Sequence, residues 1–108
     1  MIMSFLLSTS RTPVSTAAAS YFPSSYREAR ERFQANADAA GCQLTSWEIA
    51  ARGPQGETLA IDAARWGNAH ARRWLLVTTG LHGSEAPFGS AVALRLLDQL
   101  TQQEPAIS

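Results

Sequence analysis

The segment Trp74-Leu75-Leu76-Val77-Thr78-Thr79, which runs into Gly80-Leu81-His82-Gly83-Ser84-Glu85, decides the fold expected of this chain. A short run of mostly apolar residues between a polar stretch and a glycine is typical of a strand buried on both faces of a sheet. The glycines that follow predict a tight loop, and a helix is predicted from Pro87 to Gln102, because proline suits a first-turn position. The apolar stripe of this helix consists of Val92, Leu96, Leu97 and Leu100. A strand, a loop and a helix in this order indicate the α/β fold class.

A helix is also expected upstream, from Ser25 to Ala40. Ser25 followed by Glu28 fits a capping box, in which the serine oxygen accepts a backbone N–H and the glutamate reaches back. Apolar residues then recur at helical spacing, and Gly41 is a natural C-terminal stop. The segment is therefore predicted to form an amphipathic helix with one apolar face.

A hairpin is expected between this helix and the apolar strand. Leu44 to Ala51 and Thr58 to Trp66 have the composition of strands, and the loop between them has Gly53, Pro54 and Gly56 at turn positions. The predicted order is therefore helix, hairpin, buried strand, loop, helix.

Composition and charge exclude several classes of function. The chain has 108 residues, which is enough for one domain. Nine basic and nine acidic residues give a formal net charge of +0, so the basic surface that binds nucleic acid or an anionic membrane is absent. No apolar run approaches the roughly 20 residues that a membrane span needs. The single cysteine, Cys42, forms neither an intramolecular disulfide nor a CxxC motif, and a half-buried, unreactive thiol is expected.

The N-terminal stretch, residues 1–20, is expected to be a disordered tail ahead of one α/β domain over residues 21–108. Met1 to Leu7 is apolar and residues 17–19 are alanines, which faintly resembles a signal peptide. No Lys or Arg precedes the apolar run, however, and polar residues end it after Leu7. A cytoplasmic location is therefore favoured over secretion.

His82 and Glu85 are the residues of this chain that point to metal chemistry. They lie three positions apart, just past the C-terminal end of the predicted strand, where ligands bind in open α/β sheets. Zinc accepts both imidazole nitrogen and carboxylate oxygen as ligands. A catalytic zinc needs a third protein ligand and an open position for water, and the spacing alone leaves a structural hydrogen-bonding role open for both residues.

Three segments resemble, in the right order, a bacterial protein family known as DUF2817, which belongs to the zinc carboxypeptidase (M14) superfamily. They are Tyr21 to Phe33 at the opening helix, Arg52 to Asp62 at the hairpin, and Thr79 to Ala91 at a loop of the form His-Gly-x-Glu. The resemblance implies the N-terminal portion of a mixed sheet with flanking helices. It also implies one zinc ion whose first two ligands are His82 and Glu85.

The resemblance implies an activity of which this chain carries only a part. Members of the family are much longer, and their third zinc ligand (a histidine), their general-base glutamate and their substrate-binding arginine come further downstream. In such enzymes zinc polarises a carbonyl and activates water for carboxypeptidase-type hydrolysis of an amide bond, in a peptide or a smaller conjugate. The first expectation is therefore an N-terminal fragment of a zinc-dependent hydrolase that is inactive alone.

No residue within the chain is expected to complete the metal site. His70 precedes the apolar strand and His82 follows it, so a strand of about six residues at about 3.3 Å each separates the two imidazoles. His70 is expected to be an exposed loop residue and Asp62 a solvated strand residue, and Glu104 lies at the far end of the second helix. Ser84 lacks the G-x-S-x-G context of a serine nucleophile.

The alternative expectation is a non-catalytic α/β module that binds a partner or associates with itself. An open edge on the strand from Trp74 to Thr79 would expose backbone donors and acceptors that attract another strand. The ending from Gln102 to Ser108 resembles an ordinary helix exit inside a longer chain, which favours the fragment. The identity of the substrate depends on residues outside this sequence.

Overall fold

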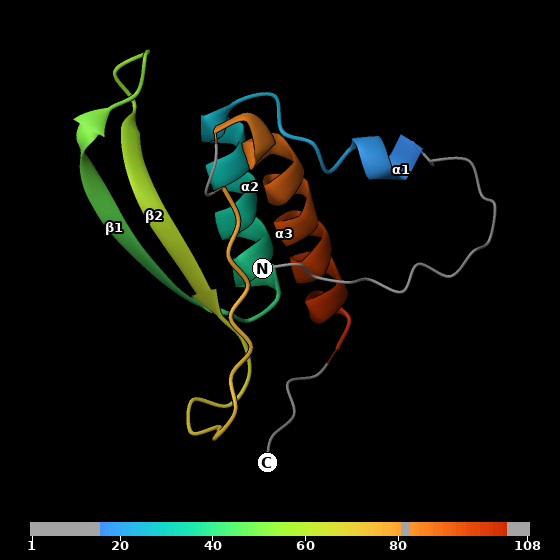
Figure 1. Cartoon of the computed structure of the whole chain (residues 1–108). Coiled ribbons are helices and arrows are strands. Elements are labelled where there is room, and N and C mark those ends of the chain that lie inside the picture. The colour runs from blue at the N-terminus through green and yellow to red at the C-terminus, as the bar shows by residue number, and fades with distance from the viewer. Residues whose placement is uncertain (1–15, 81–82, 104–108) are drawn as a thin grey trace.

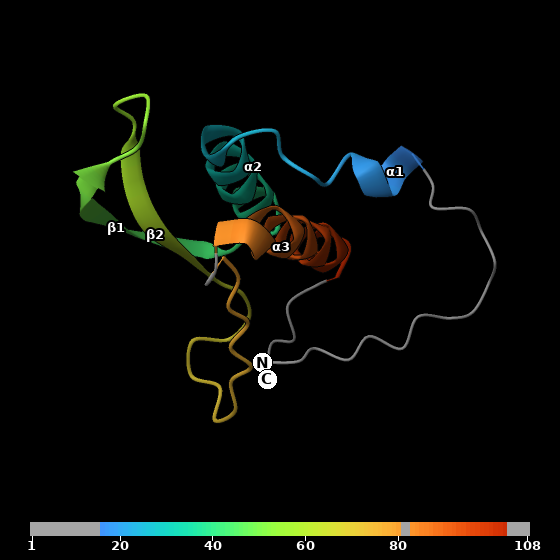
Figure 2. The ribbon, with the colours of Figure 1, turned by 45° about the horizontal axis from the view of Figure 1, so that its top comes forward.

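The structure of the chain is a computed structural model that describes residues 16–80 and 83–103 (Figure 1). Its elements are α1 (Thr16–Ala19), α2 (Tyr26–Ala39), β1 (Gln43–Arg52), β2 (Thr58–Arg65), the 3₁₀ turn η1 (Gly83–Glu85) and α3 (Ala86–Thr101). The expected α/β class is confirmed, with a helix, a hairpin and a second helix in the predicted order. Figures 1 and 2 show the β1–β2 ribbon on one side of α2 and α3 on the other. None of the described helices has the length and apolar character needed to cross a bilayer.

The ends of α2 follow from local sequence. Ser25 is extended (φ −152°), and its Oγ accepts the backbone N–H of Glu28 at 3.1 Å, as an N-cap requires. Glu28 Oε2 reaches back to the backbone N–H of Ser24 at 2.7 Å, one residue earlier than a capping box predicts. Gly41 stops the helix with φ 74°, a left-handed conformation that favours glycine. Both predicted ends of this helix are therefore confirmed to within one residue.

The predicted hairpin is confirmed as an antiparallel pair. Trp47 is opposite Ile61 and Ser46 is opposite Asp62, and the register is irregular between Ile49 and Arg52. The loop is closed by a hydrogen bond from the Gly53 N–H to the Glu57 carbonyl at 2.9 Å. Because side chains alternate across a strand, the hairpin has one face toward α2 and one outer face.

The core lies between α2 and α3 and is small. Its buried side chains are Ala37 and Ala40 at the C-terminal end of α2 and Ala91, Leu94 and Leu97 on α3. Of the predicted stripe on α3, Leu97 is buried, whereas Val92, Leu96 and Leu100 are half-buried. Small alanines let the two helices approach closely, and on α3 the buried positions include Ala91 and Leu94, which the predicted stripe left out.

The outer edge of β2 is partly occupied by a tyrosine. The Ala60 N–H donates to the Tyr26 hydroxyl at 2.8 Å, and this hydroxyl donates to the Ala60 carbonyl at 3.1 Å. Both backbone groups point away from β1, so a side chain of α2 takes the place of a neighbouring strand at this residue.

The predicted strand from Trp74 to Thr79 is wrong in this structure. Residues 73–80 belong to no helix or strand, and they run from the loop after β2 to the start of α3 (Figure 1). Leu75 is 81% exposed and Leu76 73%, so neither face of the segment is buried. A strand exists only where a neighbour accepts its hydrogen bonds. Within the described residues, β1 and β2 pair with each other alone, and Tyr26 engages the outer edge of β2 at Ala60.

Candidate metal centre

The loop that carries the predicted ligands is held against the first turn of α3 by two glycines. Gly80 has φ 76°, which favours glycine and turns the chain out of the preceding segment. A Cβ on Gly89 would lie 3.1 Å from the Thr79 Cβ and 3.3 Å from the Gly80 backbone nitrogen. The absence of that atom lets α3 approach the loop, and this contact fixes where the loop meets the helix.

Glu85, one of the two predicted zinc ligands, lies where η1 passes into α3. It is exposed, it occupies the N-cap position of α3, and its side chain makes no capping hydrogen bond. No ion pair or hydrogen bond joins its carboxylate to another described residue. The carboxylate is thus available to an external ligand. His82, the other predicted ligand, lies outside the described residues.

A groove of about 660 Å³ borders this loop. It lies between the hairpin, α2 and the start of α3, and its walls are mostly apolar. Its lining includes Phe33 of α2, Leu59 and Ile61 of β2, and Thr79, Gly83 and Pro87 around the loop. An apolar groove of this kind beside the loop is suited to an extended, largely apolar ligand.

Asp62 is not the solvated strand residue that the sequence predicts. Arg30 of α2 donates to both of its oxygens, from Nε at 2.8 Å and from Nη2 at 3.3 Å, and Ser46 donates from the neighbouring strand. The Asp62 side chain is only 10% exposed. Burial opposes its ionisation, but the hydrogen bonds from Arg30 and Ser46 outweigh burial and hold the pKa below its usual value. Asp62 is therefore an ionised residue whose two oxygens are held in a structural contact with α2.

The other groups considered for the metal site were His70 and Glu104, of which the structure describes only His70. His70 is exposed in the loop after β2, as predicted, and residues 71–79 separate it from Gly80. Glu104 lies outside the described residues. Among residues 16–80 and 83–103, no three His, Cys, Asp or Glu side chains form a group that could hold a metal ion.

The two candidate nucleophiles are unremarkable in their surroundings. Ser84 is exposed in η1. Cys42 is half-buried, as predicted, and burial raises the pKa of its thiol, which disfavours the reactive thiolate. Among the described residues, no hydrogen bond to a basic group activates either side chain as a nucleophile.

Sequence reasoning missed a polar cluster that ties the N-terminal segment and α2 to α3. The Tyr21 hydroxyl donates to Asp98 Oδ2 at 2.6 Å, and Asn36 Nδ2 donates to Asp98 Oδ1 at 3.2 Å. The Arg95 guanidinium lies 5.7 Å from the centre of the Tyr21 ring. Tyr21 and Asp98 are 77 positions apart, so no local pattern could have paired them.

The comparison with protein families identifies this chain by the same region that contains the hairpin, the loop and α3. Residues 22–107 match the family DUF2817, a protein of unknown function. No curated protein and no solved structure matches the chain. Because the match spans most of the sequence, the chain belongs to the DUF2817 family.

Proposed function

We propose that this chain is the N-terminal part of a zinc-dependent hydrolase of the zinc carboxypeptidase (M14) superfamily, in which His82 and Glu85 supply the first two ligands of one zinc ion. Membership of DUF2817 is compatible with this assignment, and the resemblance of the loop to the His-Gly-x-Glu motif supports it. The observation that carries the proposal is the exposed carboxylate of Glu85, which bonds to no other described residue and lies three positions after His82 in the sequence, at the entrance of α3.

His82 and Glu85 are chemically suited to be two of the ligands of a zinc ion. Imidazole nitrogen and carboxylate oxygen are both zinc ligands. Glu85 ends the 3₁₀ turn η1 and is exposed. When bound, zinc would polarise the carbonyl of an amide and activate water. The chain's own contributions are to hold the ion and to line the groove beside it.

Catalysis needs more than this chain offers in its described residues. A third ligand and a general base are required, and Asp62 is engaged by Arg30. We propose that both groups come from residues beyond this sequence, so that the chain alone is inactive. The substrate class is an amide, in a peptide or a smaller conjugate.

Zinc binding to the purified chain tests this proposal. Calorimetry and NMR titration with zinc should show weak binding at one site, with the largest shifts at residues around 82–86. His82→Ala and Glu85→Ala should each weaken binding about 10-fold or more, since each removes a ligand. Binding that is unchanged in His82→Ala would overturn the proposed site.

His70→Ala is the matched control. It replaces the other histidine of the chain, which is exposed at the opposite end of the preceding segment. Zinc affinity should not change in this variant. An equal loss in His70→Ala and His82→Ala would mean that zinc binds to surface histidines without a defined site.

Translation of the source DNA past the codon for Ser108 tests the wider assignment. The proposal expects a continuing reading frame that supplies a histidine and a glutamate able to complete the site. A second candidate function, a non-catalytic module that associates with itself, is favoured by one specific observation, the exposure of Trp74, Leu75 and Leu76.

A further inference from the structure

Residues 72–79, here called the pairing segment, are the least covered apolar stretch of the described chain. Leu75 and Leu76 are the two most exposed large apolar side chains of that part, at 81% and 73%, and Trp74 is 55% exposed. None of the backbone groups of the segment bonds to the backbone of another described residue. Exposed apolar side chains and free backbone donors and acceptors together are typical of a strand that lacks its partner.

The two other strand edges are less suited to accept a partner. Tyr26 occupies the outer edge of β2 at Ala60, through both backbone groups of that residue. β1 is irregular between Ile49 and Arg52, and such irregularities interrupt the pairing of an edge. In the pairing segment, no side chain of another described residue bonds to the backbone and no irregular strand register interrupts the edge.

We propose that the pairing segment binds the same segment of a second copy of this chain, as two antiparallel strands related by a two-fold axis. The inference gives a surface and a partner to the second candidate function, and it does not depend on zinc. Zinc binding and self-association involve different residues, so either can fail while the other holds.

The sequence of the pairing segment is complementary to itself when read antiparallel. It runs Arg-Arg-Trp-Leu-Leu-Val-Thr-Thr, with two arginines at one end, two threonines at the other and four apolar residues between them. An axis between Leu75 and Leu76 pairs Leu75 with Leu76 of the other copy and Trp74 with Val77. All four apolar residues then face apolar residues, and side chains that are directly opposite contact one another.

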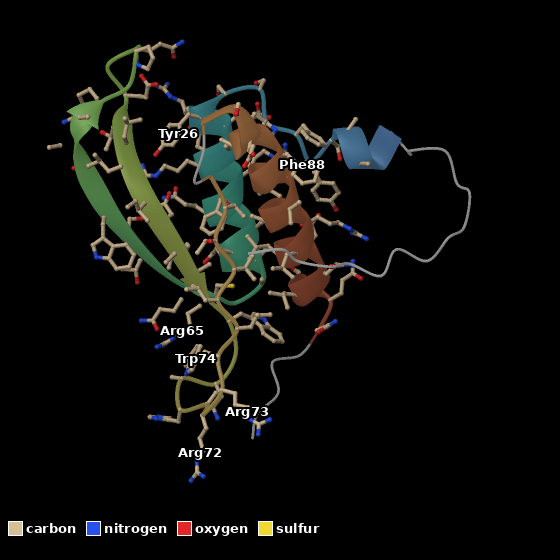
Figure 3. All side chains as sticks on the ribbon, viewed as in Figure 1. Tyr26, Arg65, Arg72, Arg73, Trp74 and Phe88 are labelled. Atoms are coloured by element: carbon tan, nitrogen blue, oxygen red, sulfur yellow. The ribbon has the colours of Figure 1, made fainter. Side chains whose placement is uncertain are left out.

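Charge selects this arrangement over the parallel one. The antiparallel register places Arg72 and Arg73 opposite Thr79 and Thr78 of the second copy, where no like charges meet. A parallel register would place each arginine opposite the same arginine, which is destabilising. Arg72 and Arg73 lie beside Trp74 at the exposed lower end of the molecule (Figure 3), and they make no ion pair with another described residue. The net charge of +0 adds no long-range repulsion between the copies.

The exposed apolar face of the hairpin is the competing surface. Trp47, Ile49 and Ile61 are 55%, 45% and 61% exposed on it, and Ile49 and Ile61 also border the groove beside α2. A partner on this face would contact side chains and no backbone groups. The backbone N–H and C=O groups of β1 and β2 largely bond to each other within the hairpin. A contact there would therefore lack the hydrogen bonds that a strand partner supplies.

Sedimentation of the whole 108-residue chain tests the proposal. Between low and high micromolar concentration the weight-average mass should rise from the 11.7 kDa monomer toward twice that value. Leu75→Lys should weaken dimerisation at least 10-fold, whereas the matched variant Ile61→Lys should leave it unchanged. Both positions are exposed, so neither substitution disturbs the core, and circular dichroism checks that each variant folds. A monomer at every concentration, or a dimer lost only in Ile61→Lys, would overturn the proposal.

Disulfide trapping tests the register independently. In a Cys42→Ser background, a mixture of Leu75→Cys and Leu76→Cys chains should oxidise to a mixed dimer several-fold faster than either chain alone. The antiparallel register brings residue 75 of one copy next to residue 76 of the other, and disulfides need Cβ atoms about 3.5–4.5 Å apart. Faster formation of dimers between identical variants would indicate a parallel or shifted pairing and would contradict the proposed register.

Discussion

Arg30 and Asp62 form the side-chain ion pair that joins the hairpin to α2. Arg30 donates to both carboxylate oxygens, and Asp62 is 10% exposed. The pKa of Asp62 in the folded chain is below its usual value, because hydrogen bonds from Arg30 and Ser46 outweigh the effect of burial. An acid with a depressed pKa adds stability above its unfolded-state pKa, and that stability is lost as the pH falls through the folded-state pKa.

Asp62→Asn should therefore lower the free energy of unfolding by about 1–2 kcal/mol at pH 7, where the carboxylate is ionised. The difference from the wild type should shrink as the pH falls below about 4, the pKa region of an unperturbed aspartate. Urea denaturation at a series of pH values measures both effects. Asp38→Asn is the control, because Asp38 is exposed and makes no side-chain ion pair with a described residue. Equal losses in the two variants would contradict a specific role for Asp62.

Single residues with local roles could be predicted from the sequence, and those with distant partners could not. Ser25 and Gly41 act on backbone groups within a few positions, so their caps follow from the sequence pattern. Asp62 bonds to a residue 32 positions away, and only the packing of α2 on the hairpin brings the two together. Glu85 lies in the predicted loop, while the placement of His82 stays a prediction.

Elements were predicted where they are stabilised from within. α2, the β1–β2 hairpin and α3 each satisfy their own backbone hydrogen bonds, so periodicity and turn residues locate them. The segment from Trp74 to Thr79 has the composition of a buried strand, but its burial depends on neighbours that the described residues do not provide. The composition of this segment thus favours a strand, but a strand forms only where a neighbouring strand pairs with it.

The contact between Tyr26 of α2 and Ala60 of β2 can be tested by substitution. Tyr26→Phe keeps the ring but removes the hydroxyl that bonds both backbone groups of Ala60. Amide hydrogen exchange at Ala60 should accelerate several-fold, and the free energy of unfolding should fall by about 1 kcal/mol. NMR-detected exchange measures the first effect and urea denaturation the second.

Tyr21→Phe is the matched control for this substitution. Its hydroxyl bonds to the side chain of Asp98 on α3 and not to the hairpin. The exchange rate at Ala60 should therefore match that of the wild type. Acceleration at Ala60 in both variants would indicate general destabilisation and would contradict a local protection by Tyr26.

The molecule as a whole has a thin core for its length. Within the described residues, three of the five buried apolar residues are alanines, and Leu94 is the largest fully buried side chain. Burial of a leucine contributes about 1.5–3 kcal/mol, and an alanine considerably less. Such a chain is expected to gain noticeably from any contact that covers Leu75 and Leu76.

The melting temperature should consequently depend on protein concentration. A dimer that forms only in the folded state stabilises it by mass action, and about 1 kcal/mol corresponds to roughly 4–8 °C in a small domain. The midpoint should rise by a few degrees with each tenfold increase in concentration. Scanning calorimetry of the wild type and of Leu75→Lys measures this effect, and a concentration-dependent midpoint in both would contradict the dimer interface.

The three tryptophans give the chain a built-in optical label. The Trp66 Nε1 is buried without a hydrogen-bond partner among the described residues, whereas Trp47 and Trp74 are each 55% exposed. An indole in water emits at longer wavelength than one shielded from it, so the emission spectrum is a sum of shielded and hydrated components. Of the two hydrated indoles, one sits inside the segment 72–79 and the other on the exposed apolar face of the hairpin. The wavelength of maximum fluorescence emission, measured with each exposed tryptophan replaced by phenylalanine in turn, therefore reports which of these two surfaces loses contact with water when the chain associates.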